Sequence, residues 1–334
     1  MKLPVQVLRL GAVAVAITLV TAGCSNKAVD APPTIAPAQA ADSPPVSDPL
    51  PGVVHALPVD GRGTVFDAAT ATLVVLSGAE VTALPATGPT RTVRLPAAAT
   101  AIAGDGDGQV LLAGRGGYLR FDIAAGKATP VPVPDHDSVE FTAVARRADG
   151  RLVLGSADGT VYTLAADGTV SAQLKMFARV DSLVTQGDTA IVLDRSQTSV
   201  TSLNKEGTAS AQALRAGEGA TTMVADDQGR VLVADTRGGE LLVYGVDPLI
   251  LRQRFPVPDA PYGLAGAELA WVSQTASNTV VGYDLATGIP VEKVRYRTVQ
   301  QPNSLAFDDA SGTLYVVSGA GAGVQVIPSA GAVK

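Results

Sequence analysis

One pattern of apolar and polar positions recurs along the chain from residue 64 onward. A small polar residue precedes a short apolar run, which is followed by a turn rich in Asp and Gly, a second apolar run and a Gly-rich or polar loop. Successive copies begin about 36 to 42 residues apart, which is the period of a propeller blade rather than of a helical repeat. The copies begin at Thr64, Thr100, Thr142, Ser182, Thr222, Gly263 and Ser304.

Each copy predicts four short β-strands. In the copy that begins at Thr142, residues 142–156 (TAVARRADGRLVLGS) give the first two strands and residues 160–174 (TVYTLAADGTVSAQL) the next two. β-Branched runs and Asp-Gly turns recur throughout, and stretches with helical periodicity are too short to matter. The pattern therefore predicts an all-β fold, a seven-bladed β-propeller.

The last copy stops after Ile327, before a fourth strand. Residues 52–57 (GVVHAL) have strand character but no strand partner nearby in the sequence. Pairing the two would remove an exposed sheet edge, which proteins avoid. We therefore expect a propeller over residues 52–334 that is closed by an N-terminal strand.

The sixth and seventh copies resemble YVTN-type β-propeller repeats, in residues 269–294 (LAWVSQTASNTVVGYDLATGIPVEKV) and 314–327 (LYVVSGAGAGVQVI). WD and GH pairs are absent from the sequence, which disfavours a WD40 protein. Residues 213–253, with VQQPNSLAFDD from Val299, are similar to mycobacterial conserved lipoproteins of the LppL type. That resemblance implies an actinobacterial cell-envelope lipoprotein and brings no catalytic motif.

The N-terminus has the features of an exported lipoprotein. Lys2 and Arg9 precede an apolar run over residues 10–20 that is too short to span a bilayer and typical of a signal peptide. Residues 20–24 (VTAGC) resemble a bacterial lipobox, although Thr21 replaces the usual Leu. We expect residues 1–23 to be a signal peptide and Cys24, the only cysteine, to carry diacylglycerol and palmitate. The alternative is a buried, inert thiol.

Residues 24–51 predict a disordered linker. Seven prolines lie among Ala, Ser and Asp, and bulky apolar residues are scarce. An extended spacer of about 25 residues reaches up to roughly 80 Å. The expected location is the extracytoplasmic face of the cell membrane, with the lipid as the membrane contact.

Composition and motifs exclude several function classes. The net charge of −6 and the pI near 5.0 argue against a nucleic-acid partner. His55 and His136 are the only histidines; neither lies in a G-x-S-x-G context, and no H-E-x-x-H or C-x-x-C pattern is present. The Gly-rich residues 104–108 and 319–323 fit hairpin turns. We expect no catalytic residue, metal or cofactor, and a monomer.

The loops that a propeller gathers on one face supply the candidate ligand site. These loops combine guanidinium, carboxylate and amide side chains. Because a guanidinium group pairs well with carboxylate and phosphate, such a ring of side chains would suit a polar or anionic ligand. Alternatively, Asp194 with Arg195, and Asp235 with Arg237, neutralise each other. The candidates are Arg115, Arg179, Asp194, Arg195, Glu218, Asp235, Arg237, Tyr262, Gln274 and Asn303, with Asn278 and Gln301 on the same loops.

The sequence favours a non-catalytic binding or scaffold module for an envelope protein, a glycan or a small ligand. The alternative is a propeller enzyme, a lactonase-like hydrolase or a sugar-oxidising enzyme, which would need a metal or quinone in the channel. A third hypothesis is a sensor of a small anionic ligand. Fold alone decides none of these.

Overall fold

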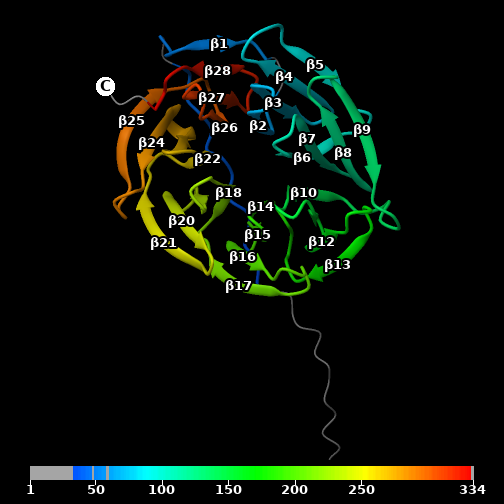
Figure 1. Ribbon diagram of the computed structural model, residues 1–334. Helices are drawn as coiled ribbons and strands as arrows, with labels where there is room; N and C mark the ends of the chain where they lie inside the picture. The colour runs from blue at the N-terminus through cyan, green and yellow to red at the C-terminus, as the bar shows by residue number, and fades with distance from the viewer. Residues whose placement is uncertain (1–32, 47–48, 58–59, 332–334) are drawn as a thin grey trace, which may run out of the picture. The chain divides into compact units, whose positions relative to one another are not determined.

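The structure, a computed structural model, describes residues 33–46, 49–57 and 60–331. These residues form seven four-stranded antiparallel sheets and one short 3-10 helix, η1 (Thr275–Ser277). Figure 1 shows the sheets arranged as blades around a common axis. The predicted seven-bladed β-propeller is confirmed, whereas the predicted signal peptide and Cys24 lie outside the described residues.

Blades 1 to 6 each use four consecutive strands, ordered from the axis outward. Blade 1 comprises β2 (Gly63–Asp67), β3 (Thr72–Ser77), β4 (Glu80–Pro85) and β5 (Arg91–Arg94); blade 2 comprises β6 (Ala99–Gly104), β7 (Gln109–Gly114), β8 (Gly117–Asp122) and β9 (Lys127–Pro132). Blade 3 comprises β10 (Phe141–Arg146), β11 (Leu152–Ser156), β12 (Thr160–Leu164) and β13 (Val170–Lys175); blade 4 comprises β14 (Ser182–Gln186), β15 (Thr189–Asp194), β16 (Ser199–Leu203) and β17 (Ser210–Arg215). Blade 5 comprises β18 (Ala220–Ala225), β19 (Arg230–Asp235), β20 (Glu240–Val246) and β21 (Leu249–Pro256); blade 6 comprises β22 (Pro261–Gly266), β23 (Ala270–Gln274), β24 (Thr279–Asp284) and β25 (Val291–Arg297).

Blade 7 combines strands from the two ends of the propeller. It comprises β26 (Pro302–Asp308), β27 (Thr313–Ser318), β28 (Val324–Ile327) and β1 (Val53–His55), and β1 pairs with β28 in the register Val53↔Val326. The buried Gln325 side chain fastens the closure, because its Nε2 donates to the carbonyl of Pro51 at 2.8 Å. The predicted closing strand is therefore present, with His55 exposed on it.

The core lies between neighbouring blades. Second and third strands are buried on both faces, which explains apolar runs such as TLVVLS in β3, whereas outer strands such as β21 are mostly exposed. Between blades 6 and 7 the fully buried Trp271 ring stacks on Phe307, with ring centroids 5.6 Å apart. The innermost strands contact one another in sequence around the ring, from β2 to β26 and back to β2.

Membrane-spanning helices are not found in the part of the chain that the structure describes, where none is long and apolar enough.

Candidate functional site

Two sets of loops lie on one side of the propeller, which we call the loop face. They are the connections between second and third strands, and the connections between blades. In blades 4 to 7 they cover residues 194–199, 215–220, 235–240, 256–261, 274–279, 297–302 and 318–324. The opposite side, the hairpin face, carries the turns between first and second strands and between third and fourth strands.

The last residue of the second strand organises the loop face in blades 4 and 5. Asp194 and Asp235 are fully buried. The carboxylate of Asp235 accepts hydrogen bonds from the backbone N–H groups of Glu218, Gly219 and Gly238 at 2.8, 2.7 and 3.0 Å. Asp194 accepts in the same way from Ala178 at 2.7 Å and Gln197 at 3.0 Å. Both carboxylates therefore fix loop backbone, and the expectation that they bind a ligand is not supported by this geometry.

The neighbouring arginines are not paired with these carboxylates. Arg237 Nη2 donates to the carbonyl of Ala36 at 2.7 Å, and its Nη1 donates to the carbonyl of Glu218 at 3.2 Å. Arg195 Nη2 donates to the carbonyl of Ala38. The alternative of self-neutralising Asp–Arg pairs at 194–195 and 235–237 is therefore wrong, because both guanidinium groups hold the chain's own N-terminal segment.

That segment, residues 35–44, crosses the loop face from blade 4 to the connection between blades 6 and 7. It begins where the Ile35 N–H donates to the Ser196 carbonyl at 2.8 Å. Further along, the Ala41 N–H donates to Thr275 Oγ1 at 3.1 Å, and Asn278 Nδ2 donates to the Pro44 carbonyl at 2.7 Å. In Figure 1 the blue segment passes behind the inner strands of these blades.

Gln301 clamps the far end of the segment. Its side-chain Nε2 donates to the Ala41 carbonyl at 2.9 Å, while its Oε1 accepts from the Ser43 N–H at 3.1 Å. The Ser43 hydroxyl donates to the Thr275 carbonyl at 2.6 Å and accepts from the Gln301 N–H at 3.0 Å. Gln301 adopts a positive φ of 56°, which is unusual for a glutamine and indicates a constrained position.

These contacts differ from the free spacer that the sequence predicts for residues 24–51. The composition is that of a linker, and the described residues 33–46 form no helix or strand. An extended, proline-rich backbone leaves its carbonyl and N–H groups unpaired. Loop side chains of blades 4 to 7 bind these groups, so the bound part of the linker belongs structurally to the propeller.

Five other predicted site residues do not converge on one ligand position. Arg115 is exposed in blade 2, and Arg179 forms an ion pair with Asp181 at 3.3 Å. Gln274 is buried and accepts from Arg295 Nη1 at 2.6 Å. Glu218 is exposed, and Tyr262 is half-buried. Of the ten candidates, Arg195 and Arg237 contact the segment directly, and Asn303 supports Gln301 through a 3.1 Å hydrogen bond.

Asp181 is a largely buried titratable group next to this arrangement. Burial raises the pKa of the Asp181 carboxyl above its ordinary value, although the backbone N–H of Arg195 and the charges of Arg195 and Arg179 act in the opposite direction. The Arg195 N–H donates to this carboxylate at 2.8 Å. Asp181 therefore positions the loop that carries Arg195.

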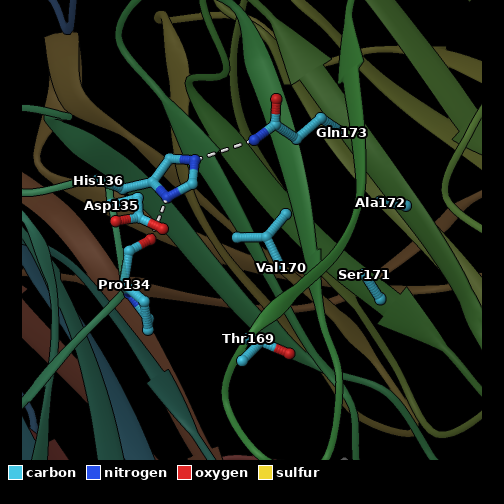
Figure 2. A pocket seen from close by; sticks show the side chains of 8 residues that line it. All are labelled: Pro134, Asp135, His136, Thr169, Val170, Ser171, Ala172 and Gln173. Carbon is cyan, nitrogen blue, oxygen red and sulfur yellow. Dashed lines mark hydrogen bonds between the residues drawn. The ribbon is translucent and has the colours of Figure 1, made fainter.

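His136 lies in a separate, open cavity of about 400 Å³ on the connection between blades 2 and 3. Figure 2 shows both ring nitrogens engaged, Nδ1 with the Pro134 carbonyl at 2.6 Å and Nε2 with the Gln173 amide at 2.9 Å. Because a carbonyl only accepts, Nδ1 carries the proton in this arrangement. Its ring also stacks edge-on against Tyr162, with centroids 5.0 Å apart, so His136 has a structural role.

Among the described residues, no group of three or more His, Cys, Asp or Glu side chains is placed to hold a metal ion.

Comparison with known proteins identifies the fold alone. No family model matches the chain, and no curated protein matches its sequence, so the resemblance to YVTN repeats and LppL-type lipoproteins gains no support. Solved structures match at low identity. A streptogramin B lyase is 12% identical with a TM-score of 0.68, covering 83% of this chain and 96% of that one.

Two further neighbours have the same fold. Virginiamycin B lyase from Staphylococcus aureus is 11% identical with a TM-score of 0.66, covering 81% of this chain and 96% of that one. A chain of Kuenenia stuttgartiensis hydrazine synthase is 14% identical with a TM-score of 0.67, covering 86% and 98%. Because these proteins differ in their stated chemistry, the comparisons assign a β-propeller and no activity.

Proposed function

We propose that this protein is a cell-envelope lipoprotein whose β-propeller is a non-catalytic binding module, held at the outer side of the membrane by a lipid on Cys24. One observation carries the binding role. Three of the polar loop-face side chains that the sequence offers, Arg237, Arg195 and Gln301, donate to the carbonyls of Ala36, Ala38 and Ala41. The chemistry of this face is thus recognition of an extended chain.

The loop face supports the alternative of a propeller enzyme less well than it supports a binding module. Asp194 and Asp235, the fully buried carboxylates that end the second strands of blades 4 and 5, already accept several backbone hydrogen bonds each. A general base or nucleophile must instead reach a substrate proton or carbon. The lyases among the structural neighbours share the fold with this chain at 11 to 12% identity.

The bound segment shortens the proposed tether. Ile35, the first residue with a described contact to the loop face, follows Cys24 by 11 positions, which is at most about 40 Å of fully extended chain. The free spacer expected from the sequence would reach about twice as far. The tether leaves from the loop face, so this face lies nearest the lipid in our proposal.

Both faces carry net negative charge, and the hairpin face carries more of it, which favours the same orientation. The hairpins between first and second strands carry a net charge of −6, from ten carboxylates and four guanidinium groups, and anionic lipid would repel them. The residues counted are Asp67, Asp105, Asp107, Asp149, Asp188, Asp226, Asp227, Glu268, Asp308 and Asp309, against Arg146, Arg147, Arg151 and Arg230.

The anchor is tested by comparing the wild-type chain with Cys24→Ala in a bacterial host that processes lipoproteins. We expect the wild type in the membrane fraction, with the mass of a diacylglycerol-modified cysteine, and Cys24→Ala in the soluble fraction. Detection of unmodified wild type in the soluble fraction would contradict the anchor.

The binding role is tested separately with a photocrosslinking residue at exposed Glu218 on the loop face, and with a matched one at exposed Asp227 on the hairpin face. Adducts with a second polypeptide are expected at position 218. Equal yields at the two positions, or adducts only at position 227, would contradict binding through the loop face.

A further inference from the structure

We infer that the loop face of blades 4 to 7 is a recognition site for extended, proline-rich polypeptide, and that residues 35–44 occupy it in cis. The partner is a segment of the same kind on a neighbouring envelope protein. This inference rests on the proposed binding role and names the class of partner. We use the word groove for the set of residues that hydrogen-bond the segment, which are Arg195, Ser196, Arg237, Thr275, Asn278, Gln300 and Gln301.

Most groove contacts are hydrogen bonds to backbone groups of the segment. Arginine and amide side chains donate to the carbonyls of residues 36, 38, 41, 43 and 44, and groove oxygens accept the N–H groups of residues 35, 41 and 43. Because every polypeptide has the same backbone groups, these contacts do not select a sequence. They select a chain whose carbonyl and N–H groups are free, as in an extended conformation. Pro37 and Pro44 favour that conformation before binding, which lowers the entropy that binding removes.

Two positions add sequence selectivity. Ala38 is 7% exposed and lies over Gly219, where an added Cβ would stand 2.9 Å from the Ala38 Cβ, so only a small side chain fits. Ser43 uses its hydroxyl twice, toward the Thr275 carbonyl and the Gln301 N–H. The preferred ligand therefore has a small residue, then a serine five positions later, followed by proline.

The cis segment leaves part of the groove unsatisfied. Arg195 Nε, Gln197 Nε2 and Thr198 Oγ1 are buried in the blade 4 loop and have no hydrogen-bond partner among the described residues. Buried polar groups are normally paired. These groups are enclosed, so a ligand reaches them only if the blade 4 loop rearranges.

The segment can leave without opening the propeller. Its one backbone–backbone hydrogen bond to the blades joins Ile35 to Ser196, and ring closure depends on β1 and β28 instead. While bound, it competes with any partner, because a tethered ligand acts at an effective concentration on the order of millimolar. The intact chain should therefore bind a free peptide about 10- to 1000-fold more weakly than a chain whose segment is released.

The test uses the soluble mature chain with Cys24→Ser and a fluorescent peptide of residues 33–46. Ala38→Glu should release the segment, since a large charged side chain does not fit over Gly219, whereas the neighbouring exposed Gln39→Glu is the matched control. Fluorescence anisotropy should show binding to Ala38→Glu at least 10-fold tighter than to wild type or Gln39→Glu. A peptide carrying Ser43→Ala should bind about 10-fold more weakly.

Hydrogen exchange at Ala41 and Ser43 verifies release, and the melting temperature verifies folding. If Ala38→Glu is folded and its segment exchanges freely but the peptide does not bind, the inference is overturned. Replacing residues 33–46 by a Gly/Ser linker of equal length repeats the test without a new charge. If sedimentation shows a wild-type dimer that Ala38→Glu abolishes, the occupant is a second copy, and our assignment of a different partner is wrong. Because no lipid is present, failure of the anchor would not affect these outcomes.

Discussion

Ser43 and Gln301, 258 positions apart, bind each other reciprocally: the Ser43 N–H donates to Gln301 Oε1 at 3.1 Å, and the Gln301 N–H donates to Ser43 Oγ at 3.0 Å. This pair fixes an N-terminal segment to the connection between blades 6 and 7. Ser43, which lies in a sequence typical of a linker, thereby forms a specific contact with Gln301.

Ser43→Ala removes the hydroxyl from two hydrogen bonds, to the Thr275 carbonyl and from the Gln301 N–H. Net contributions of about 0.5–1.5 kcal/mol each imply that segment binding weakens by about 1–3 kcal/mol. Hydrogen exchange at the Ala41 amide should accelerate about 5-fold or more. Exposed Asp42→Ala is the control, and equal exchange in the two variants would contradict the role of Ser43.

Asp235→Ala deprives three loop N–H groups of their acceptor. Leaving buried donors unpaired should lower the free energy of unfolding by about 2–4 kcal/mol, measured by urea denaturation. Exposed Asp227→Ala should change it by less than about 0.5 kcal/mol. Similar losses in both variants would show that the burial of Asp235 has no special importance.

Asp181 should make stability fall with rising pH. Because burial raises its pKa in the folded state above the ordinary 3.8, the folded chain binds the proton more tightly than the unfolded chain between these two values. The free energy of unfolding of wild type should therefore decrease relative to Asp181→Asn as the pH rises from about 3.8 through the raised pKa. It should then stay constant at higher pH.

The opposite slope is expected from Asp167, whose pKa is lowered by hydrogen bonds from the Thr169 hydroxyl and N–H. Wild type should lose stability relative to Asp167→Asn as the pH falls below about 3.8. Urea denaturation of wild type and both variants over the same pH range distinguishes the two slopes. If the difference in free energy of unfolding between wild type and Asp181→Asn does not change with pH, protonation of Asp181 is not linked to folding.

Ring closure is tested by two shortened chains. A chain that begins at residue 47 keeps β1 and the buried Leu57, whereas one that begins at residue 61 lacks both. Losing a strand and a core residue should lower the free energy of unfolding by about 3–5 kcal/mol and expose the β28 edge. Light scattering should then detect aggregation of the shorter chain alone. Identical denaturation of the two chains would exclude a closing role.

The sequence predicts the propeller because several blades repeat the same contacts. Thr100 and Thr142, two of the small polar residues that begin the copies, donate through Oγ1 to the carbonyls of Phe141 and Val180 at 2.5 and 2.6 Å. Each bond joins a first strand to the next blade or to the connection that leads into it. The hydroxyl, the buried strand and the Asp-Gly turn recur together, so the period is visible without homologues.

The candidate site is predicted only in part. Arg195 and Arg237 are recognisable as loop arginines, but their ligand is a segment about 157 and 201 positions away. Thr275, Ser196 and Gln300 give no signal, because they contribute through backbone groups or common side chains. The segment itself has the composition of a free linker. Contacts made to backbone groups place few demands on residue type, so the sequence does not predict that this segment binds the loop face.

The pairing of β1 with β28 also orders events in time. Strand β1 leaves the ribosome before any blade is made, and its partner residues 324–327 follow the strands of blades 1 to 6. Blades 1 to 6 are built from local hairpins, yet the ring has no complete seventh blade until residue 327 is available. If the chain crosses a membrane from its N-terminus, as we propose, the ring closes only after residues 324–327 have arrived.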